Sequence, residues 1–236
     1  MATRTHQNRF PVGTSAVPRT KPLPARGLMK ERAYHEIRKR ILDGEFPSST
    51  FLSERQMAGE LAMSKTPVRA ALERLELEGF VTISPQQGII VRDLSVHAIA
   101  DLYEMRAVLE TFILRTVAGS LCAAQIAAVQ TNLKTQKEAL PSGDIPLAVR
   151  LDAEFHMLFC TFLGNQEMLR VMGQLRDRIF RVISRVFHIN PGRIASSYTE
   201  HRSIAEAVIN GDGVQAAKLI VEHLNRGKRH LIAPRG

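Results

Sequence analysis

A change of residue pattern at Gly79 constrains the fold of this chain more than any other feature of its sequence. Before Gly79, apolar residues recur at the spacing of an amphipathic helix in three successive stretches, residues 28–44, 53–61 and 64–78. After it, two runs of β-branched and aromatic residues, 80–83 and 89–91, flank turn-forming residues. Three short helices followed by a β-hairpin wing is the order of a winged helix-turn-helix, which we expect over residues 28–94.

Short polar residues mark the starts of the second and third helices, which follow a predicted loop over residues 46–52. Ser53 and Gln56 have the spacing of a capping box, in which each side chain bonds the backbone N–H of the other residue. Ser64 is placed to cap the third helix, and Pro67 fits its first turn because a missing N–H is no loss there. The two helices are therefore separated by a tight turn.

Everything after residue 94 has the periodicity of helices, separated by Pro, Gly and Asn residues. We expect a C-terminal all-α bundle over residues 95–236, with helices near 95–118, 123–139, 144–163, 165–188, 196–210 and 213–231. The break near residue 120 is the least defined, so the bundle has six or seven helices. The predicted fold class is therefore mostly α, with the hairpin as its β element.

The formal net charge of +9 is concentrated at the start of the chain. Residues 1–27 contain five Lys or Arg and no acid, residues 28–94 contain ten of each, and residues 95–236 carry an excess of four bases. Four prolines among residues 1–27 oppose a helix, so we expect a disordered basic tail there; a transit peptide is the alternative. The positive charge favours a polyanionic partner, either nucleic acid or an anionic membrane surface.

Neither a membrane span nor a secretory signal is predicted. No uncharged apolar run approaches the roughly 18 residues of a transmembrane helix, and no signal-peptide pattern opens the chain. Cys122 and Cys160 form no disulfide framework and suit a reducing compartment. We therefore expect a cytoplasmic protein without a membrane partner.

The third predicted helix has the features of a DNA-recognition helix. Its apolar residues at i, i+4 and i+7 form one face: Val68, Leu72 and Leu75. Lys65, Thr66 and Arg69 lie off that face, at the end of the helix that meets base edges in helix-turn-helix proteins. Arg55 begins the preceding helix, and Gly88 lets the tip of the wing approach a DNA backbone. Each residue alone is an ordinary solvated group, but together and in this order they predict binding to double-stranded DNA.

Three stretches of the sequence resemble the GntR family of bacterial regulators. They are LSERQMA at residues 52–58, SKTPVRAALERL at 64–75 and EGFV at 78–81. The helical remainder resembles the ligand-binding (FCD) domain of the FadR-like subfamily, and the two resemblances together cover residues 28–232. They imply a homodimer that binds a palindromic operator.

The family resemblance also implies which residues contact operator DNA. They are Arg55, Lys65, Thr66, Arg69 and Gly88. The position of Lys65 is commonly Arg in the family, and Lys keeps the charge without the bidentate geometry of a guanidinium. Lys65 therefore lacks the two-pronged contact by which an Arg reads a guanine edge.

Four residues in the C-terminal part of the chain predict a metal site. Asp152 and His156 are four residues apart, so both project from one side of a helix, beside an apolar stripe. His201 and His223 each lie on the apolar face of another helix. Burying these groups unpaired is costly, whereas a shared divalent cation satisfies all four. The FadR-like resemblance implies the same ligands, one Asp and three His, which suit zinc as the first candidate and also nickel or manganese.

Arg106 shares a helix face with apolar residues, where a guanidinium must find a partner or reach solvent. Its partner is either an acid on the same helix, Asp101 or Glu110, or the carboxylate of a small effector. The subfamily resemblance implies the effector. Arg106 and a metal together would suit a hydroxy acid or a dicarboxylic acid.

These features predict a sequence-specific DNA-binding transcription regulator, by default a repressor, whose operator binding is controlled by a small carboxylate beside a metal. Two other classes compete with it. A three-His-plus-Asp metal site could activate water in a hydrolase-like enzyme, but no His-Glu-x-x-His helix is present, and Glu104 and Glu154 are more simply surface acids. An architectural DNA-binding protein would explain the basic tail but not the metal ligands. We therefore expect a regulator and not an enzyme.

Overall fold

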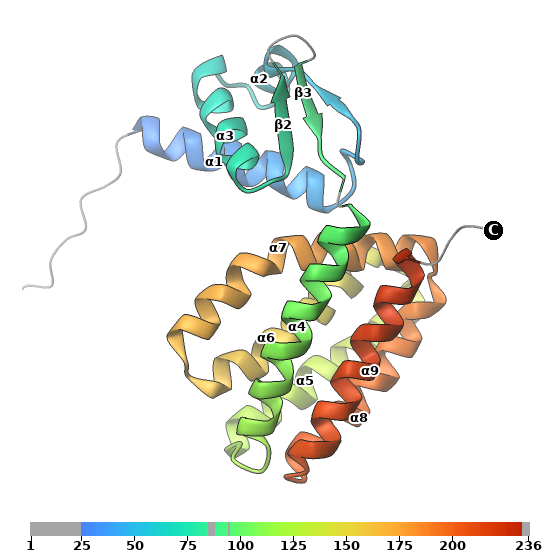
Figure 1. Cartoon of the computed structure of the whole chain (residues 1–236). Coiled ribbons are helices and arrows are strands. Elements are labelled where there is room, and N and C mark those ends of the chain that lie inside the picture. The colour runs from blue at the N-terminus through green and yellow to red at the C-terminus, as the bar shows by residue number, and fades with distance from the viewer. Residues whose placement is uncertain (1–24, 85–87, 94, 233–236) are drawn as a thin grey trace, which may run out of the picture.

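A computed structural model describes residues 25–84, 88–93 and 95–232 of the chain (Figure 1). The predicted basic tail lies outside these ranges, apart from its last three residues. The described residues form an N-terminal domain of three helices and a small sheet, followed by a C-terminal bundle of six α-helices. The predicted fold class, a winged helix-turn-helix joined to an all-α bundle, is confirmed.

The N-terminal domain has one more strand than the sequence predicted. Its elements are α1 (Ala25–Leu42), β1 (Phe51–Leu52), α2 (Glu54–Glu60), α3 (Lys65–Leu77), β2 (Val81–Ser84) and β3 (Gly88–Val91). The predicted antiparallel hairpin pairs β2 with β3, with Val81 opposite Val91. β1 pairs with the other side of β3, where the sequence predicted only loop. Two residues are too few to show an alternating pattern, and a long-range contact decides their conformation.

Helix α3, which the sequence predicted to be the recognition helix, packs into the core as predicted, but the caps predicted for α3 and α2 do not form: Ser64 lies at the N-cap of α3 and makes no side-chain capping hydrogen bond. Val68, Leu72 and Leu75 are fully buried in the core of the N-terminal domain. Ser53 lies at the N-cap of α2 but makes no capping hydrogen bond, so the predicted capping box is wrong. Gln56 Nε2 donates instead to Glu60 Oε1 at 2.8 Å. On an exposed helix, such an i, i+4 bond competes with the cap for the same side chain.

The C-terminal bundle has six α-helices and one short 3₁₀ turn within the described residues. They are α4 (Val96–Val117), α5 (Ala123–Ala139), η1 (Leu140–Ser142), α6 (Ile145–Leu163), α7 (Gln166–Ile189), α8 (Gly192–Ile209) and α9 (Gly213–Ile232). Each α-helix begins within one residue of its predicted start, except α8, which was predicted to begin at residue 196. Pro191 has helical backbone angles and the Arg193 N–H donates to Asn190 O at 2.9 Å, so the Pro-Gly pair opens the helix instead of preceding it. None of the described helices is both long and apolar enough to cross a membrane.

Two glycines explain why the chain breaks near residue 120. Gly119 and Gly211 have φ angles of +72° and +81°, and a Cβ on Gly119 would lie 3.1 Å from Gly211 Cα. The Gly119 N–H also donates to Val208 O at 2.9 Å. The loops α4–α5 and α8–α9 therefore meet backbone to backbone, which only glycine permits at both positions.

Helix α7 forms the junction between the two domains. It crosses the end of the bundle that lies nearest the N-terminal domain (Figure 1). Asp177 forms an ion pair with Arg38 of α1, and Arg185 Nη1 lies 2.9 Å from Asp93 Oδ1. Arg181 donates to a backbone carbonyl just after β3. The opposite face of α7 is buried in the core of the bundle, so one helix contacts both domains.

Candidate functional sites

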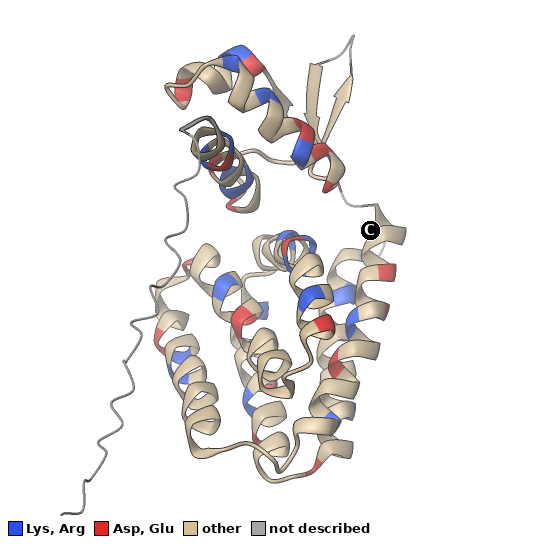
Figure 2. Ribbon diagram, turned by 90° about the vertical axis from the view of Figure 1, so that its left-hand side faces the viewer, with Lys and Arg blue, Asp and Glu red and all other residues tan. Residues whose placement is uncertain are grey.

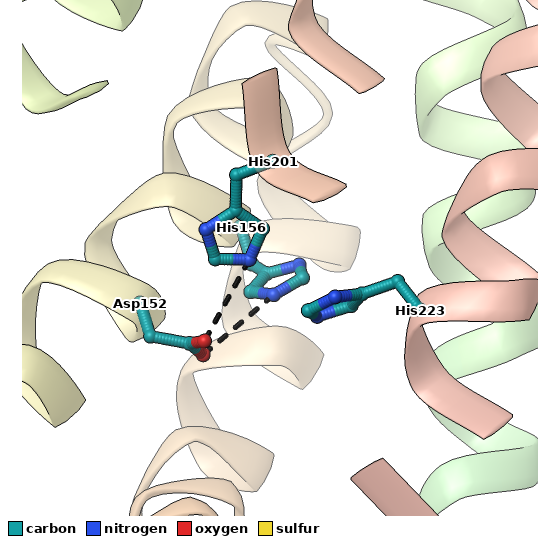
Figure 3. Close-up of side chains that lie close together, drawn as sticks. All are labelled: Asp152, His156, His201 and His223. Atoms are coloured by element: carbon teal, nitrogen blue, oxygen red, sulfur yellow. Dashed lines mark ion pairs between the residues drawn. The ribbon is translucent and has the colours of Figure 1, made fainter. Parts of the chain in front are cut away.

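Four side chains from three helices converge in the middle of the bundle (Figure 3). Asp152 and His156 come from α6, His201 from α8 and His223 from α9, and all four are buried. One potential ligand atom from each lies within 4.8 Å of the others. The Asp152 carboxylate is 3.7 Å from His156 Nε2 and 3.6 Å from His201 Nε2. These distances are too long for hydrogen bonds but suit atoms that share one ion at about 2.0–2.2 Å.

An acceptor outside this cluster holds each imidazole at its Nδ1 atom. The acceptors are Glu110 Oε2 for His156 (2.5 Å), Glu200 Oε2 for His223 (2.7 Å) and Gln136 Oε1 for His201 (3.0 Å). An acceptor at Nδ1 places the proton there, which leaves the Nε2 lone pair to face the cluster. Nε2 of His156, Nε2 of His201 and Oδ2 of Asp152 are buried and have no hydrogen-bond partner among the described residues. Three orphaned acceptors around one point fit a cation.

The charges around the cluster are fixed by its neighbours. Burial opposes the charge of Glu110, but the Arg106 guanidinium and His156 outweigh it and lower the pKa of Glu110 to about 2. Burial likewise opposes the charge of Glu200, and hydrogen bonds from an imidazole and two guanidiniums lower its pKa to about 2. Burial lowers the pKa of His201 well below its usual value. Both carboxylates are therefore ionised, and the His201 imidazole is neutral, the form that binds a metal.

Arg106 has a protein partner and also a free donor. It is buried on α4, and its Nε donates to Glu110 Oε1 at 2.7 Å. Glu110 is one of the two acids that the sequence suggested as its partner; the other, Asp101, is exposed. Because Glu110 also contacts His156, one carboxylate links Arg106 to the cluster. Arg106 Nη2 is buried without a hydrogen-bond partner among the described residues.

Apart from Glu110, sequence patterns did not identify the residues that surround the cluster. Ser197 Oγ donates to Asp152 Oδ1 at 3.0 Å, and Arg193 Nη2 donates to Glu200 Oε2 at 2.5 Å. Gln136 also belongs to this set. Arg193 was hidden because the sequence placed it before the start of α8. The available signal was helical spacing, because Arg193, Ser197 and Glu200 recur every three or four residues on the face of His201.

A small cavity of about 20 Å³ adjoins the cluster. Its polar lining consists of Tyr103, Arg106, Asp152, Arg193, Ser197 and His223. Apolar residues of α7 form another part of its wall. Burial raises the pKa of Tyr103 to about 12, so this hydroxyl keeps its proton. The cavity therefore places cationic and hydroxyl donors beside the cluster of Asp152 and the three histidines.

The residues predicted to contact DNA are accessible in the N-terminal domain. Arg55, Lys65, Thr66 and Arg69 are exposed, and Gly88 is exposed with a φ of +83°. The Arg69 side chain is 66% exposed, and its Nε donates to Glu54 Oε1 at 2.9 Å. Figure 2 shows basic and acidic residues mixed along the helices of this domain, in keeping with its balanced charge. Recognition by this domain must therefore depend on particular side chains rather than on a uniform basic surface.

Two family models match the chain. "Bacterial regulatory proteins, gntR family" matches residues 29–91, and "FCD domain" matches residues 101–226.

Proteins of similar sequence are also named as transcription regulators. The Nta operon transcriptional regulator of Aminobacter aminovorans is 29% identical, covering 74% of this chain and 81% of its own. The HTH-type transcriptional repressor RspR of Escherichia coli is 24% identical, with coverages of 83% and 86%.

Solved structures show the same fold. E. coli McbR/YncC has a TM-score of 0.72 and 18% identity, covering 84% of this chain and 94% of its own. A GntR regulator from Rhodococcus sp. RHA1 has a TM-score of 0.74 and 22% identity, with coverages of 87% and 99%. These families are transcription regulators, so the expectation that the protein is not an enzyme is confirmed. The chain belongs to the GntR family of bacterial transcription regulators and joins its DNA-binding domain to a C-terminal FCD domain.

Proposed function

We propose that this GntR-family regulator is a repressor whose operator binding is controlled by a small carboxylate bound beside a divalent metal. The metal cluster carries this proposal, because three buried acceptors of Asp152, His156 and His201 converge without partners among the described residues. Arg106, with its free buried Nη2, lies on the same side-chain network and supplies a donor for the carboxylate. Zinc is the first candidate for the ion, with nickel or manganese as alternatives.

The names of two relatives support a repressor. One is RspR of E. coli, and the other is the gluconate operon transcriptional repressor of Bacillus subtilis, which is 38% identical over 94 residues, 38% of each chain. A repressor acts where the bacterial chromosome lies, so we place the protein in the cytoplasm. Its partners are a palindromic double-stranded operator and a second copy of itself.

Three measurements on the full-length protein test the proposal. Protein purified without chelator should contain about one divalent ion per chain, measured by elemental mass spectrometry. Selection from a random duplex library should enrich an inverted repeat, because two-fold protein symmetry matches a palindromic site. Small hydroxy acids should then lower the affinity for the selected duplex. Absence of any enriched duplex, or of any acid that changes its affinity, would contradict the proposal.

We assign operator contacts to Arg55, Lys65, Thr66, Arg69 and Gly88. Arg69→Ala should weaken binding to the selected duplex by roughly 1–3 kcal/mol, because Arg69 would read a base. Glu54→Gln is the matched control, since it removes the ion-pair partner and keeps the guanidinium. Its affinity should equal or exceed that of the parent in fluorescence anisotropy at one salt concentration. If Arg69→Ala binds the selected duplex as tightly as the parent does, Arg69 does not contact the DNA.

The outer face of α4 supplies a surface for the homodimer. Met105, Val108 and Phe112 are 47%, 71% and 53% exposed and lie on one side of the helix, at i, i+3 and i+7. α9 packs along another side of α4, so this face is the one left open in the described chain (Figure 1). An apolar strip of this kind, exposed to water, favours burial against a partner.

Charges at the two ends of this strip indicate that the partner is a second copy. Asp101 and Arg115 each lie seven residues from Val108, close to the same helix face. Both are exposed, and neither has an ion-pair partner within the described residues. If two α4 helices pack antiparallel about a two-fold axis at Val108, Asp101 of one protomer meets Arg115 of its partner at both ends. Such a self-complementary surface is what an isologous dimer requires.

A further inference from the structure

A cavity of about 420 Å³, which we call the junction cavity, lies where the two domains meet. The N-terminal domain contributes the end of α1, the loop that follows it and the end of β3, and the bundle contributes α4 and α7. None of its described lining residues borders the small cavity beside Asp152, because the two spaces lie against different faces of α7. Its volume is in the range of about 300–1,000 Å³ that ligand pockets occupy, and domain junctions commonly hold such pockets.

The floor of the junction cavity is apolar. It consists of residues that also belong to the buried cores of the two domains: Ile41, Leu42, Val91, Ile99 and Val182. The half-buried ring of Phe46 adds an aromatic surface to the wall. Water against this floor finds few hydrogen-bond partners, so an apolar group that displaces it gains free energy.

One wall of the junction cavity is cationic. Arg181, Arg185 and His188 line it at i, i+4 and i+7, so α7 presents them in one row. Arg185 Nη1 lies 2.9 Å from Asp93 Oδ1. Asp93 is the only acid among the described lining residues, and the two guanidiniums outnumber it even when His188 is neutral. The cavity therefore combines an apolar floor with an excess of positive charge.

The charge of Arg181 is compensated only in part. Its guanidinium donates to the backbone carbonyl of Arg92, which carries no formal charge. Burial lowers the pKa of Arg181; the carboxylate of Asp93 opposes this shift, and the like charges of Arg178 and Arg92 add to it. An anion in the cavity would supply the missing compensation through charge-assisted hydrogen bonds.

We propose that the junction cavity binds a small amphipathic monoanion, with an aromatic body on the apolar floor and its anionic group at Arg181 and Arg185. Phe46 favours an aromatic body, because two rings in contact gain free energy beyond the area that they bury. Such a molecule contacts both domains at once and stabilises the arrangement of the domains in which it binds. This site is separate from the proposed metal and effector site and goes beyond the proposed function.

The alternative is that the cavity is only space between two domains that the ion pair of Arg185 and Asp93 holds together. In that case Arg185 acts through Asp93, and loss of either partner has the same effect. A binding role predicts opposite effects, because Asp93 competes with the ligand for the guanidinium. The two side chains are 39% and 51% exposed, so their ion pair contributes little to stability and either can be replaced.

Calorimetric titration of the full-length protein with 2-naphthoate tests this inference. The probe has an aromatic body and one carboxylate; 2-naphthamide keeps the body without the charge, and acetate keeps the charge without the body. 2-Naphthoate should bind the parent more tightly than either of the other two. Arg185→Gln should weaken its binding about tenfold, the loss expected for one charge-assisted hydrogen bond to a partly exposed group. Asp93→Asn should bind it as tightly as the parent or more tightly.

A second pair of variants locates the probe. Ser184 lines the junction cavity and is half-buried on α7. Ser184→Phe should fill part of the cavity and abolish binding of 2-naphthoate, whereas Ser184→Ala should leave the affinity unchanged. A chelator should also leave it unchanged, because no described lining residue belongs to the metal cluster. Circular dichroism checks that each variant and the chelated parent are folded.

Several outcomes would overturn the inference. Failure of 2-naphthoate to bind the parent would refute it, and so would equal binding of 2-naphthamide or acetate. Equal losses in Arg185→Gln and Asp93→Asn would show that the ion pair only holds the domains together. Parental binding by folded Ser184→Phe, or loss of binding by the folded, chelated parent, would place the probe elsewhere in the protein. Zinc content and operator binding are measured separately, so the proposed function stands or fails independently of these results.

Discussion

His201→Ala should abolish metal binding and, with it, the sensitivity of thermal unfolding to a chelator. In the zinc-loaded parent, a chelator should lower Tm by about 5–10 °C, because an ion at one hundred times its Kd stabilises the folded state by about 2.7 kcal/mol. His201 is fully buried, and its Nε2 is one of the orphaned acceptors. Its loss should lower zinc affinity by more than the 10- to 100-fold that outer partners of a metal site contribute. The measurements are zinc content and Tm with and without chelator.

Comparing the Tm of one variant with and without chelator separates the effect of losing the metal from the effect of losing packing. Removing a buried imidazole also leaves a cavity, but that cost is the same with and without chelator and cancels in the difference. His97→Ala is the control, because His97 is exposed on α4 and lies outside the cluster. It should keep its zinc and its chelator-sensitive Tm. A His201→Ala protein with one zinc per chain and a parental response to chelator would refute the ligand assignment.

Val108→Asp should convert the protein from dimer to monomer and, as a consequence, largely abolish specific operator binding. The substitution places two carboxylates next to each other on the proposed two-fold axis, and like charges in an interface cost several kcal/mol. A monomer contacts only one half of a palindromic operator and loses the affinity that linkage of two binding domains provides. Molar mass by light scattering and operator affinity by anisotropy measure the two effects.

Two controls make this prediction specific to the α4 face. Val214→Asp alters a side chain of α9 in a residue that is 73% exposed, close to the 71% of Val108, and should leave a dimer. Asp101→Arg and Arg115→Asp should each weaken the dimer, and the double reversal should restore it, because the ion pairs form again with exchanged partners. If Val108→Asp dimerises as tightly as the parent, the outer face of α4 is not the dimer interface. The same conclusion follows if the double reversal dimerises less tightly than both single variants.

The fold could be predicted from the sequence because its elements are long or have distinct local patterns. The periodicity of α3 and the caps and breaks of the bundle placed nearly every helix within a residue. Besides the caps of α2 and α3, two errors concerned the elements themselves, and both occurred where the local pattern is weak. β1 is two residues long and exists through its pairing with β3. α8 begins at a Pro-Gly pair, which is usually a break, but here Pro191 has the φ of a helix.

The four clustered residues could be recognised because Asp and His are unusual on apolar helix faces. The residues that hydrogen-bond to these four from outside the cluster could not be recognised from the sequence, because an Arg, Glu or Gln on an amphipathic helix is normally solvated. From the sequence, Glu110 was only one of two candidate ion-pair partners of Arg106. In the structure its carboxylate is hydrogen-bonded to both Arg106 and His156. Arg193 depends on the true start of α8, and its contact with Glu200 depends on how α8 is rotated. Such features follow from the packing of several helices rather than from any one of them.

Helix α7 connects the cavity in the C-terminal bundle with the N-terminal domain. This single helix of 24 residues supplies Ile183 and Phe187 to the wall of the cavity, while Arg181 and Arg185 hold the segment after the wing. A helix moves as a rigid rod, so a shift imposed on one of its faces appears on the other. Free-energy coupling is reciprocal. If the proposed carboxylate lowers the affinity for the operator, operator binding must lower the affinity for the carboxylate by the same factor, so the protein would have one ligand affinity on DNA and another when free in solution.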